Sequence, residues 1–217
     1  MIRSLLGGFV KEIGVEISDL MLSDLERFAV ELRKWNGKIN LTAITSDEDI
    51  AIKHLVDSII VSRWMCNTNR LLDIGSGAGV PAIPLKILLP KTQVMSVDAV
   101  GKKISFQRHI ARLLELQGFD AVHTRVESLH RTHAGYFDVI ISRAFSRLDT
   151  LVSLAAPLLS TGGKIIAMKG PSAEGEISGE KKCLKDSGLY VIDVQPYVLP
   201  LNKGERRLVI VAATQAP

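Results

Sequence analysis

The chain has 217 residues, of which 47% are hydrophobic and 23% charged, so it has enough apolar material for one core of ordinary domain size. It has no apolar run of the roughly 18–20 residues that span a bilayer and no cleavable signal pattern at its start, so we expect a cytoplasmic protein without a membrane segment. The net charge of +4 permits a polyanionic partner, and Cys66 and Cys183 are expected to be reduced and structural, with no disulfide framework and no metal site.

Residues 1–66 are predicted to form an N-terminal helical cap, with some helix in the lead-in at 1–19. A capping box at 23–26 predicts the start of the next helix, because its hydroxyl and carboxylate can each satisfy a backbone N–H. Apolar residues follow at helical spacing, Gly37 is expected to end the helix, and a loop rich in amides is expected up to Thr42. A further helix is predicted from Ser46 to about Trp64. No linker rich in Pro, Gly or Ser follows, so the cap should pack against a sheet domain at 67–217.

From Arg70 onward, strand and helix patterns alternate, which predicts an α/β fold with a mostly parallel sheet covered by helices on both faces. The last two strands are expected to pair antiparallel. The predicted strands are 70–74, 93–97, 121–124, 137–142, 164–168, 191–198 and 206–213, and the predicted helices after the cap are 83–89, 102–116, 148–159 and 174–187. Leu113 is expected to face inward on the helix at 102–116, and the segment 160–163 is expected to end the helix at 148–159.

A glycine-rich loop follows the first predicted strand. Gly75, Gly77 and Gly79 allow positive φ angles and a close approach of a ligand to the backbone, although an ordinary strand-to-helix turn is the alternative. The dinucleotide fingerprint needs a glycine where this chain has Val80, and Asp73 would lie unfavourably close to a pyrophosphate. An acid suits the positively charged groups of S-adenosylmethionine, and the pattern resembles the first motif of the seven-stranded methyltransferases that use this cofactor, a Rossmann-like fold.

The ends of the next two strands offer further ligand contacts. Asp98 follows the second strand and can accept hydrogen bonds from both hydroxyls of a ribose, or can instead cap the helix that follows. After the third strand, the backbone N–H groups of Val126 and Glu127 can bind the edge of an adenine, although the spacing alone fits a surface acid at Glu127 nearly as well. Together these positions favour a nucleoside-containing ligand.

The end of the fourth strand limits the chemistry. It has no Asn/Asp-Pro-Pro-aromatic turn of the kind used to methylate an exocyclic amine, and neither cysteine is near enough in the predicted fold to attack a pyrimidine. A guanine N7 already presents a lone pair, so positioning alone can supply much of the rate effect. Arg143, at the end of this strand, is a candidate to contact the cofactor or the target base, with a surface ion pair as the alternative.

Motifs along residues 20–210 resemble the glucose-inhibited division protein B family of small-subunit rRNA guanine-N7 methyltransferases. The residues most specific to this family are Pro81 and Pro84 in the glycine loop and the segment Trp35-Asn36 to Asn40-Leu41-Thr42. Two positions depart from the family pattern, with Ala82 in place of a Gly and Asp98 in place of a Glu. The other matching segments are His54 to Ser58, Asp73 to Leu85, Lys102-Lys103 with Phe106, Arg125 with Glu127, Ser142-Arg143-Ala144 and Lys169-Gly170.

The resemblance implies methyl transfer from S-adenosylmethionine to 16S rRNA, within the small ribosomal subunit or an assembly intermediate, by a monomeric enzyme. It implies cofactor contacts at Gly75, Val80, Val126, Glu127 and Arg143, to which the physical reading adds Asp73, Gly77, Gly79 and Asp98. Candidate substrate-handling and catalytic residues are Asn40, Arg143 and Lys169. A phosphate-facing surface is predicted from Lys86, Lys102, Lys103, Arg108, Arg112, Lys203, Arg206 and Arg207.

Three other readings remain open on the sequence alone. A methyltransferase acting on another RNA, a protein or a small molecule would share the glycine loop and Asp98. A nicotinamide-dependent oxidoreductase would need the glycine that Val80 replaces. A noncatalytic relative of the fold could bind RNA without modifying it.

Overall fold

The computed structural model describes residues 2–143, 145, 147–171, 173, 175, 184 and 186–213. Its strands are β1 (Arg70–Ile74), β2 (Gln93–Asp98), β3 (Phe119–His123), β4 (Phe137–Arg143), β5 (Leu159–Lys169), β6 (Tyr190–Val198) and β7 (Glu205–Ala212). They form one seven-stranded sheet in the order β3-β2-β1-β4-β5-β7-β6. Strands β1 to β5 are parallel, while β7 pairs antiparallel with both β5 and β6. This confirms the predicted mostly parallel sheet and its antiparallel final pair.

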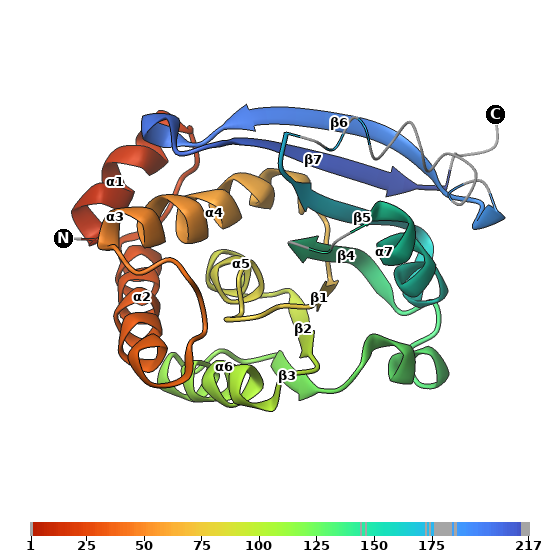
Figure 1. The fold of residues 1–217 in the computed structure, drawn as a ribbon, viewed down its shortest axis with the longest axis horizontal. Helices are drawn as coiled ribbons and strands as arrows, with labels where there is room; N and C mark the ends of the chain where they lie inside the picture. The colour runs from red at the N-terminus through yellow and green to blue at the C-terminus, as the bar shows by residue number, and fades with distance from the viewer. Residues whose placement is uncertain are drawn as a thin grey trace.

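The helices between the strands cover both faces of the sheet, as Figure 1 shows. They are α5 (Ala82–Leu88), α6 (Gly101–Leu113) and α7 (Leu148–Ala155), with the short 3-10 helices η3 (Val126–Arg131), η4 (Ala156–Leu158) and η5 (Pro200–Asn202). The helix predicted at 174–187 falls largely outside the described residues, as does Cys183. In the part of the chain that the structure describes, no helix is both long and apolar enough to cross a membrane.

Alternate residues of the central strands enter two separate cores, as the two-residue period of a strand requires. Leu71 of β1 packs into the core beneath α5 and α6, whereas its neighbour Leu72 packs into the core beneath α7. The same alternation places Ile141 of β4 in the first core and Ile140 in the second. Both faces of the sheet are therefore buried, which explains the continuous apolar runs of its strands.

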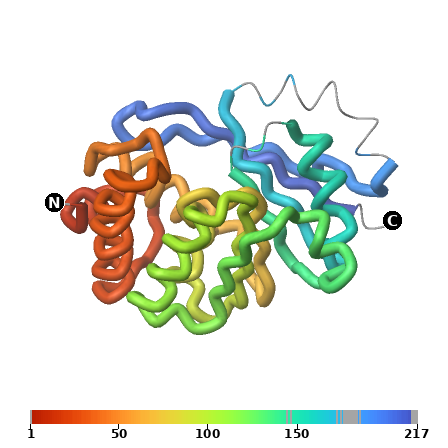
Figure 2. Tube along the Cα trace, turned by 60° about the horizontal axis from the view of Figure 1, so that its bottom comes forward, coloured from red at the N-terminus to blue at the C-terminus, as the bar shows by residue number. Residues whose placement is uncertain are grey.

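The N-terminal residues form a layer of helices at one end of the molecule, far from α7 in Figures 1 and 2. This layer consists of α1 (Ile2–Glu12), α2 (Asp19–Ile39), α3 (Asp47–Ile50), the π-helix η1 (Ala51–Val56), α4 (Asp57–Val61) and the 3-10 turn η2 (Ser62–Trp64). Trp35 of α2 lies against α6, with its ring centroid 5.6 Å from that of Phe106 and 5.1 Å from that of His109. The cap shares one core with α5 and α6, while its boundary at residue 66 stays a prediction.

The limits of α2 differ from those predicted. The helix begins at Asp19 because the hydroxyl of Ser18 accepts a hydrogen bond from the Met21 N–H, at 3.2 Å, so the predicted capping box at 23–26 is wrong. Its end was also placed too early, since Gly37 remains helical and Asn40 provides the left-handed cap, with φ 49°. The predicted amide-rich loop is therefore mostly the last turn of α2.

Three further local predictions are corrected. The helix predicted at 46–64 exists, but its middle is the π-helix η1, which apolar spacing did not indicate. The segment 160–163, predicted to end a helix, belongs to β5, where the pairing with β4 shifts register beside Asp138. Leu113, predicted to face inward on α6, is 37% exposed, whereas Gln107 is fully buried.

Candidate active site

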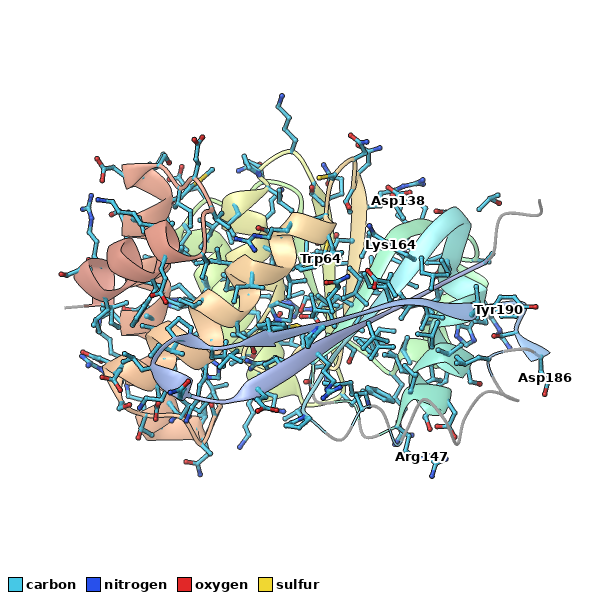
Figure 3. All side chains as sticks on the ribbon, turned by 90° about the horizontal axis from the view of Figure 1, so that it is seen from above. Trp64, Asp138, Arg147, Lys164, Asp186 and Tyr190 are labelled. Carbon is cyan, nitrogen blue, oxygen red and sulfur yellow. The ribbon has the colours of Figure 1, made fainter. Side chains whose placement is uncertain are left out.

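The carboxyl ends of β1 to β5 meet at one edge of the sheet. Figure 3 shows the amino and carboxyl edges of the sheet on opposite sides of the molecule, with Asp138 at the start of β4 on one side and Arg147, beyond the end of β4, on the other. The strand order reverses between β1 and β4, and ligands of open parallel sheets bind outside the carboxyl ends of the strands at such a point. Two adjoining pockets lie at this edge.

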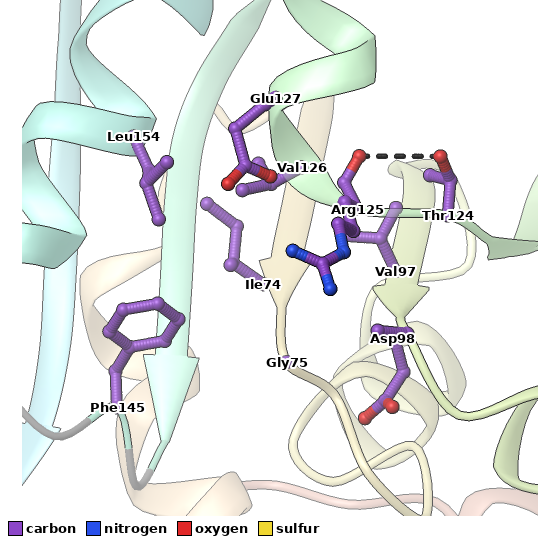
Figure 4. A pocket seen from close by; sticks show the side chains of 11 residues that line it. Ile74, Gly75, Val97, Asp98, Thr124, Arg125, Val126, Glu127, Phe145 and Leu154 are labelled. Carbon is purple, nitrogen blue, oxygen red and sulfur yellow. Dashed lines mark hydrogen bonds between the residues drawn. The ribbon is translucent and has the colours of Figure 1, made fainter.

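The first pocket lies over β1, β2 and β3 and has a volume of about 220 Å³. Gly75, Asp98, Val126 and Glu127 all line it, so the structure brings these predicted contacts together (Figure 4). Val126 and Glu127 begin η3, and the first N–H groups of a helix have no partner within it. The remaining lining residues are Ile74, Val97, Ala99, Thr124, Arg125, Phe145 and Leu154.

The glycine loop is left-handed at Gly75, Gly77 and Gly79, with φ of 70°, 59° and 77°. Only Gly75 lines the first pocket. A Cβ on Gly79 would lie 2.5 Å from Cδ1 of Ile83 on α5, so close packing and the positive φ both favour glycine here. Val80 is buried and precedes a cis peptide bond to Pro81, and it does not line the pocket.

Asp98 links the glycine loop to the first pocket. Its carboxylate accepts hydrogen bonds from the N–H of Gly77, at 2.9 Å, and from the N–H of Val100, at 2.8 Å. Lys103 Nζ lies 3.8 Å from Oδ2. A carboxylate can accept about four hydrogen bonds, so each oxygen retains capacity for a ligand hydroxyl.

Asp73 is fully buried and lines neither pocket. Oδ2 accepts a hydrogen bond from the Ala82 N–H, at 3.2 Å, which ties β1 to the start of α5. Burial raises the pKa of the Asp73 carboxyl to about 7, against the lowering effects of the Ala82 N–H and Arg143. Oδ1 is buried with no hydrogen-bond partner among the described residues.

Gln107 holds the glycine loop from behind, a role that the sequence predictions missed. Nε2 donates to the Ser76 hydroxyl, at 2.8 Å, and to the Gly77 carbonyl, at 2.9 Å, while Oε1 accepts from the Ser96 hydroxyl, at 2.6 Å. Gln107 lies three residues after Ile104 and three before Ile110, both buried. This helical spacing could have identified it as a polar residue on an inward face.

The second pocket lies beside the ends of β4 and β5 and has a volume of about 370 Å³. It adjoins the first, because Lys169 lines the second pocket and donates to the carbonyl of Phe145, which lines the first, at 3.0 Å. Most of the charged side chains around it are cationic. Its lining residues are Thr42, Ala43, Ile44, Lys53, His54, Asp57, Arg143, Met168, Lys169, Gly170 and Arg206.

The candidate catalytic residues are only partly brought together. Arg143 and Lys169 both line the second pocket, whereas the exposed Asn40 caps α2 and lines neither pocket. Arg143 Nη1 donates to the Lys53 carbonyl, at 2.8 Å, and lies 3.2 Å from His54 Nδ1, so this arginine is anchored to the cap. Arg143 does not line the first pocket, where a contact with the cofactor was predicted.

The buried polar groups of the second pocket join the cap to the sheet. The Tyr197 hydroxyl of β6 donates to Asp57 Oδ1, at 2.5 Å, and Oδ2 lies 3.9 Å from Arg143 and 3.7 Å from Arg206. Burial raises the pKa of Asp57, while the Tyr197 hydroxyl and the two arginines oppose the rise. Burial and the nearby Arg143 lower the pKa of His54 to about 3, so its imidazole is neutral at pH 7.

The predicted phosphate-facing surface needs one correction. Lys86 is buried, because its ammonium group donates to the carbonyls of Pro90, at 2.8 Å, and Thr92, at 2.6 Å, and it cannot face RNA. Lys203 is paired with Glu48 and Asp49. The exposed basic residues on α6 are Lys102, Arg108 and Arg112.

Sequence comparison relates this chain to known proteins over most of its length. The family model GidB, described as rRNA small subunit methyltransferase G, matches residues 21–202. Ribosomal RNA small subunit methyltransferase G of Geotalea uraniireducens is 49% identical over 199 residues, covering 92% of this chain and 91% of the relative. The protein of the same name from Geobacter sulfurreducens is 48% identical over 198 residues, covering 91% of each.

Solved structures agree with the fold at much lower sequence identity. A SAM-dependent methyltransferase from Aquifex aeolicus superposes with a TM-score of 0.58 at 12% identity, covering 84% of this chain and 97% of that one. The predicted methyltransferase fold is thus confirmed. From its sequence matches, the chain belongs to the GidB family, the rRNA small subunit methyltransferases G.

Proposed function

We propose that this chain transfers a methyl group from S-adenosylmethionine to N7 of a guanine in 16S rRNA. The observation that carries the proposal is the pairing of two adjoining pockets at the switch point of the sheet, one beside a glycine loop and the other rich in cations. Family membership supports the rRNA substrate. The proposal includes a small subunit or assembly intermediate as the substrate particle, and a cytoplasmic monomer as the active form.

The residues of the first pocket fit S-adenosylmethionine. Gly75 exposes backbone without a side chain, Asp98 retains acceptor capacity for ribose hydroxyls, and the start of η3 offers N–H groups to an adenine edge. Asp73 directly precedes the pocket residues Ile74 and Gly75, and its buried Oδ1 has no hydrogen-bond partner among the described residues. When bound, the cofactor supplies an electrophilic methyl group to N7.

The second pocket is suited to hold the RNA. Lys53, Arg143 and Arg206 present positive charge, which attracts phosphate groups and orients the strand without reading its sequence. Guanine N7 carries a free lone pair, so the site needs no base to prepare it. His54 is neutral and hydrogen-bonded at both ring nitrogens, which suits a role in positioning.

The decisive experiment combines labelled S-adenosylmethionine with small-subunit particles that lack their own modification, followed by mapping of the labelled base. The expected result is a single N7-methylguanine in 16S rRNA. Label in a protein, in a small molecule or in another base would instead support a methyltransferase of another specificity. No transfer to the particle or to naked rRNA would contradict the proposal.

Cofactor placement is tested by replacing Asp98. Asp98→Asn should weaken S-adenosylmethionine binding by about 1–3 kcal/mol in calorimetry, the usual scale for removing a partner from a buried polar group. The matched control is Asp120→Asn, since Asp120 is an exposed aspartate on β3. Equal cofactor affinity in the Asp98 variant and the control would contradict this placement.

A further inference from the structure

A chain of three polar side chains runs along the wall of the second pocket. Arg143 Nη1 lies 3.2 Å from Nδ1 of His54, and Nε2 of His54 lies 3.1 Å from the Thr42 hydroxyl oxygen. The same hydroxyl oxygen accepts a hydrogen bond from the Ile44 N–H, at 3.1 Å. Thr42, His54 and Arg143 all line the pocket.

The arginine determines which nitrogen of His54 carries the proton. A guanidinium only donates hydrogen bonds, so Nδ1 of His54 must be the acceptor and its hydrogen must be on Nε2. A proton on Nδ1 would face the Nη1–H donor, and a doubly protonated ring is disfavoured because burial and Arg143 lower the pKa to about 3. Nε2 of His54 therefore donates to Thr42.

This tautomer leaves Thr42 as a hydrogen-bond donor. A hydroxyl has two acceptor sites and one hydrogen, and both acceptor sites are used by the N–H of Ile44 and by Nε2–H of His54. Among the described residues, the Thr42 hydroxyl makes no hydrogen bond beyond those to His54 and the Ile44 N–H. Thr42 is half-buried on the pocket wall, so the remaining direction for this hydrogen is the pocket.

We propose that Thr42 donates a hydrogen bond to an acceptor oxygen of the substrate RNA, with His54 and Arg143 as positioning residues that hold its hydroxyl in the donor orientation. This inference rests on the proposed function. The acceptor has two possible sources, O6 of the target guanine or a backbone phosphate oxygen near it. A contact with O6 would help to select guanine, because adenine presents a donor amino group at that position.

The test compares Thr42→Val, which keeps the shape and removes the hydroxyl, with Thr42→Ser, which restores it. Methylation kinetics are measured with reconstituted particles that carry either guanine or 2-aminopurine at the target position, since 2-aminopurine keeps N7 and lacks O6. The expected result with guanine is a loss of about tenfold in kcat/KM for the valine variant, the scale of one hydrogen bond, and near-normal activity for serine. Cofactor affinity should stay unchanged in both.

The 2-aminopurine particles identify the acceptor. A valine penalty that disappears on 2-aminopurine assigns the contact to O6, and a penalty that is equal on both substrates assigns it to phosphate. Both results support a donor role, whereas valine activity within twofold of wild type on guanine would overturn it. A penalty of the same size in the serine variant would also overturn it.

Two controls keep the test decisive. If Thr42→Val unfolds, Thr42→Cys replaces it, since a thiol of similar size donates weakly, and full activity of the cysteine variant would likewise overturn the proposal. The wild-type reaction separates the two proposals. If wild-type enzyme methylates guanine N7 and the valine variant does too, only the role of Thr42 fails, and if wild type fails, the proposed function fails.

Discussion

Gln107 Nε2 on α6 lies 2.9 Å from the carbonyl oxygen of Gly77, so the helix after β2 fixes the loop after β1. The amide is fully buried and also bonds the hydroxyls of Ser76 and Ser96. One side chain thus forms hydrogen bonds with buried polar groups of both the glycine loop and β2. The conformation of the glycine loop is therefore stabilised by the hydrogen bonds of Gln107 as well as allowed by the positive φ angles of its glycines.

Replacing Gln107 should therefore weaken both folding and the first pocket. Gln107→Leu keeps the volume and leaves the Gly77 carbonyl and two buried hydroxyls without their partner, which should cost roughly 2–4 kcal/mol of unfolding free energy. Urea unfolding measures this loss, and calorimetry should show weaker S-adenosylmethionine binding. Gln117→Leu, on an exposed position, is the control and should change stability little. Equal losses for the two variants would contradict the bracing role.

Asp73 should make stability depend on pH in a defined direction. Because burial raises its pKa to about 7 from 3.8, the folded state retains a proton that the unfolded state has lost between these pH values. The contribution of this group to stability is therefore largest below about pH 4 and is lost as pH rises to about 7, at about 1.4 kcal/mol per unit.

Asp73→Asn removes this titration. Between pH 4 and 7, the unfolding free energy of the variant should rise relative to wild type by about 1.4 kcal/mol per unit, and the difference should level off above pH 7. Thermal or urea unfolding across this range measures it. Asp120→Asn, at an exposed position, should follow the wild-type profile. Parallel profiles for Asp73→Asn and wild type would show that the carboxyl is ionised throughout.

The hydrogen bond from Tyr197 to Asp57 should stabilise the joint between β6 and α4. Tyr197→Phe deletes only the hydroxyl and leaves Asp57 Oδ1, which is buried, without that donor, so we expect a loss of about 1–3 kcal/mol in unfolding free energy. Tyr190→Phe is a matched control on the same strand, because Tyr190 is 39% exposed. A melting temperature equal to that of the control would indicate that the bond contributes nothing net.

The first pocket could be predicted from sequence because its parts follow short strands. An apolar run that ends at an acid or glycine indicates the carboxyl end of a strand. Because the strands of a parallel sheet run in the same direction, these ends lie together at one edge of the sheet. Gly75, Asp98 and Glu127 were predicted in this way, and all three line the first pocket. Val80 and Gly79 belong to the same loop, but neither lines the first pocket, and both make close packing contacts that spacing alone could not indicate.

The second pocket could not be derived from spacing. It joins Thr42 of the cap to Arg143 of β4 and Arg206 of β7, and no local pattern records which distant segments meet. The end of the fourth strand indicated Arg143, and the resemblance supplied Lys169. Asp57 lay within a matched motif, but no role was predicted for it. Tyr197, on an apparently ordinary strand, gave no signal at all. The start of α2 was missed because Ser18 and Ser23 both match a helix start, and tertiary context chose the first.

The cations of the second pocket should make RNA binding sensitive to salt. Each phosphate contact releases counterions, so log K should fall with log salt by about 0.7–0.9 per contact. Lys53 lines this pocket and its side chain is 29% exposed, with Asp49 3.3 Å away. Lys53→Gln should therefore weaken binding to rRNA and reduce the salt slope by about one contact, or roughly 0.7–0.9.

Lys91 provides the matched control for Lys53. It is exposed just before β2, at the amino edge of the sheet and away from both pockets, so Lys91→Gln should leave the salt slope unchanged although it removes the same charge. Binding is measured by filter retention or fluorescence at several salt concentrations. If both variants reduce the slope equally, the attraction depends on net charge alone, and the second pocket does not direct RNA to the carboxyl edge of the sheet.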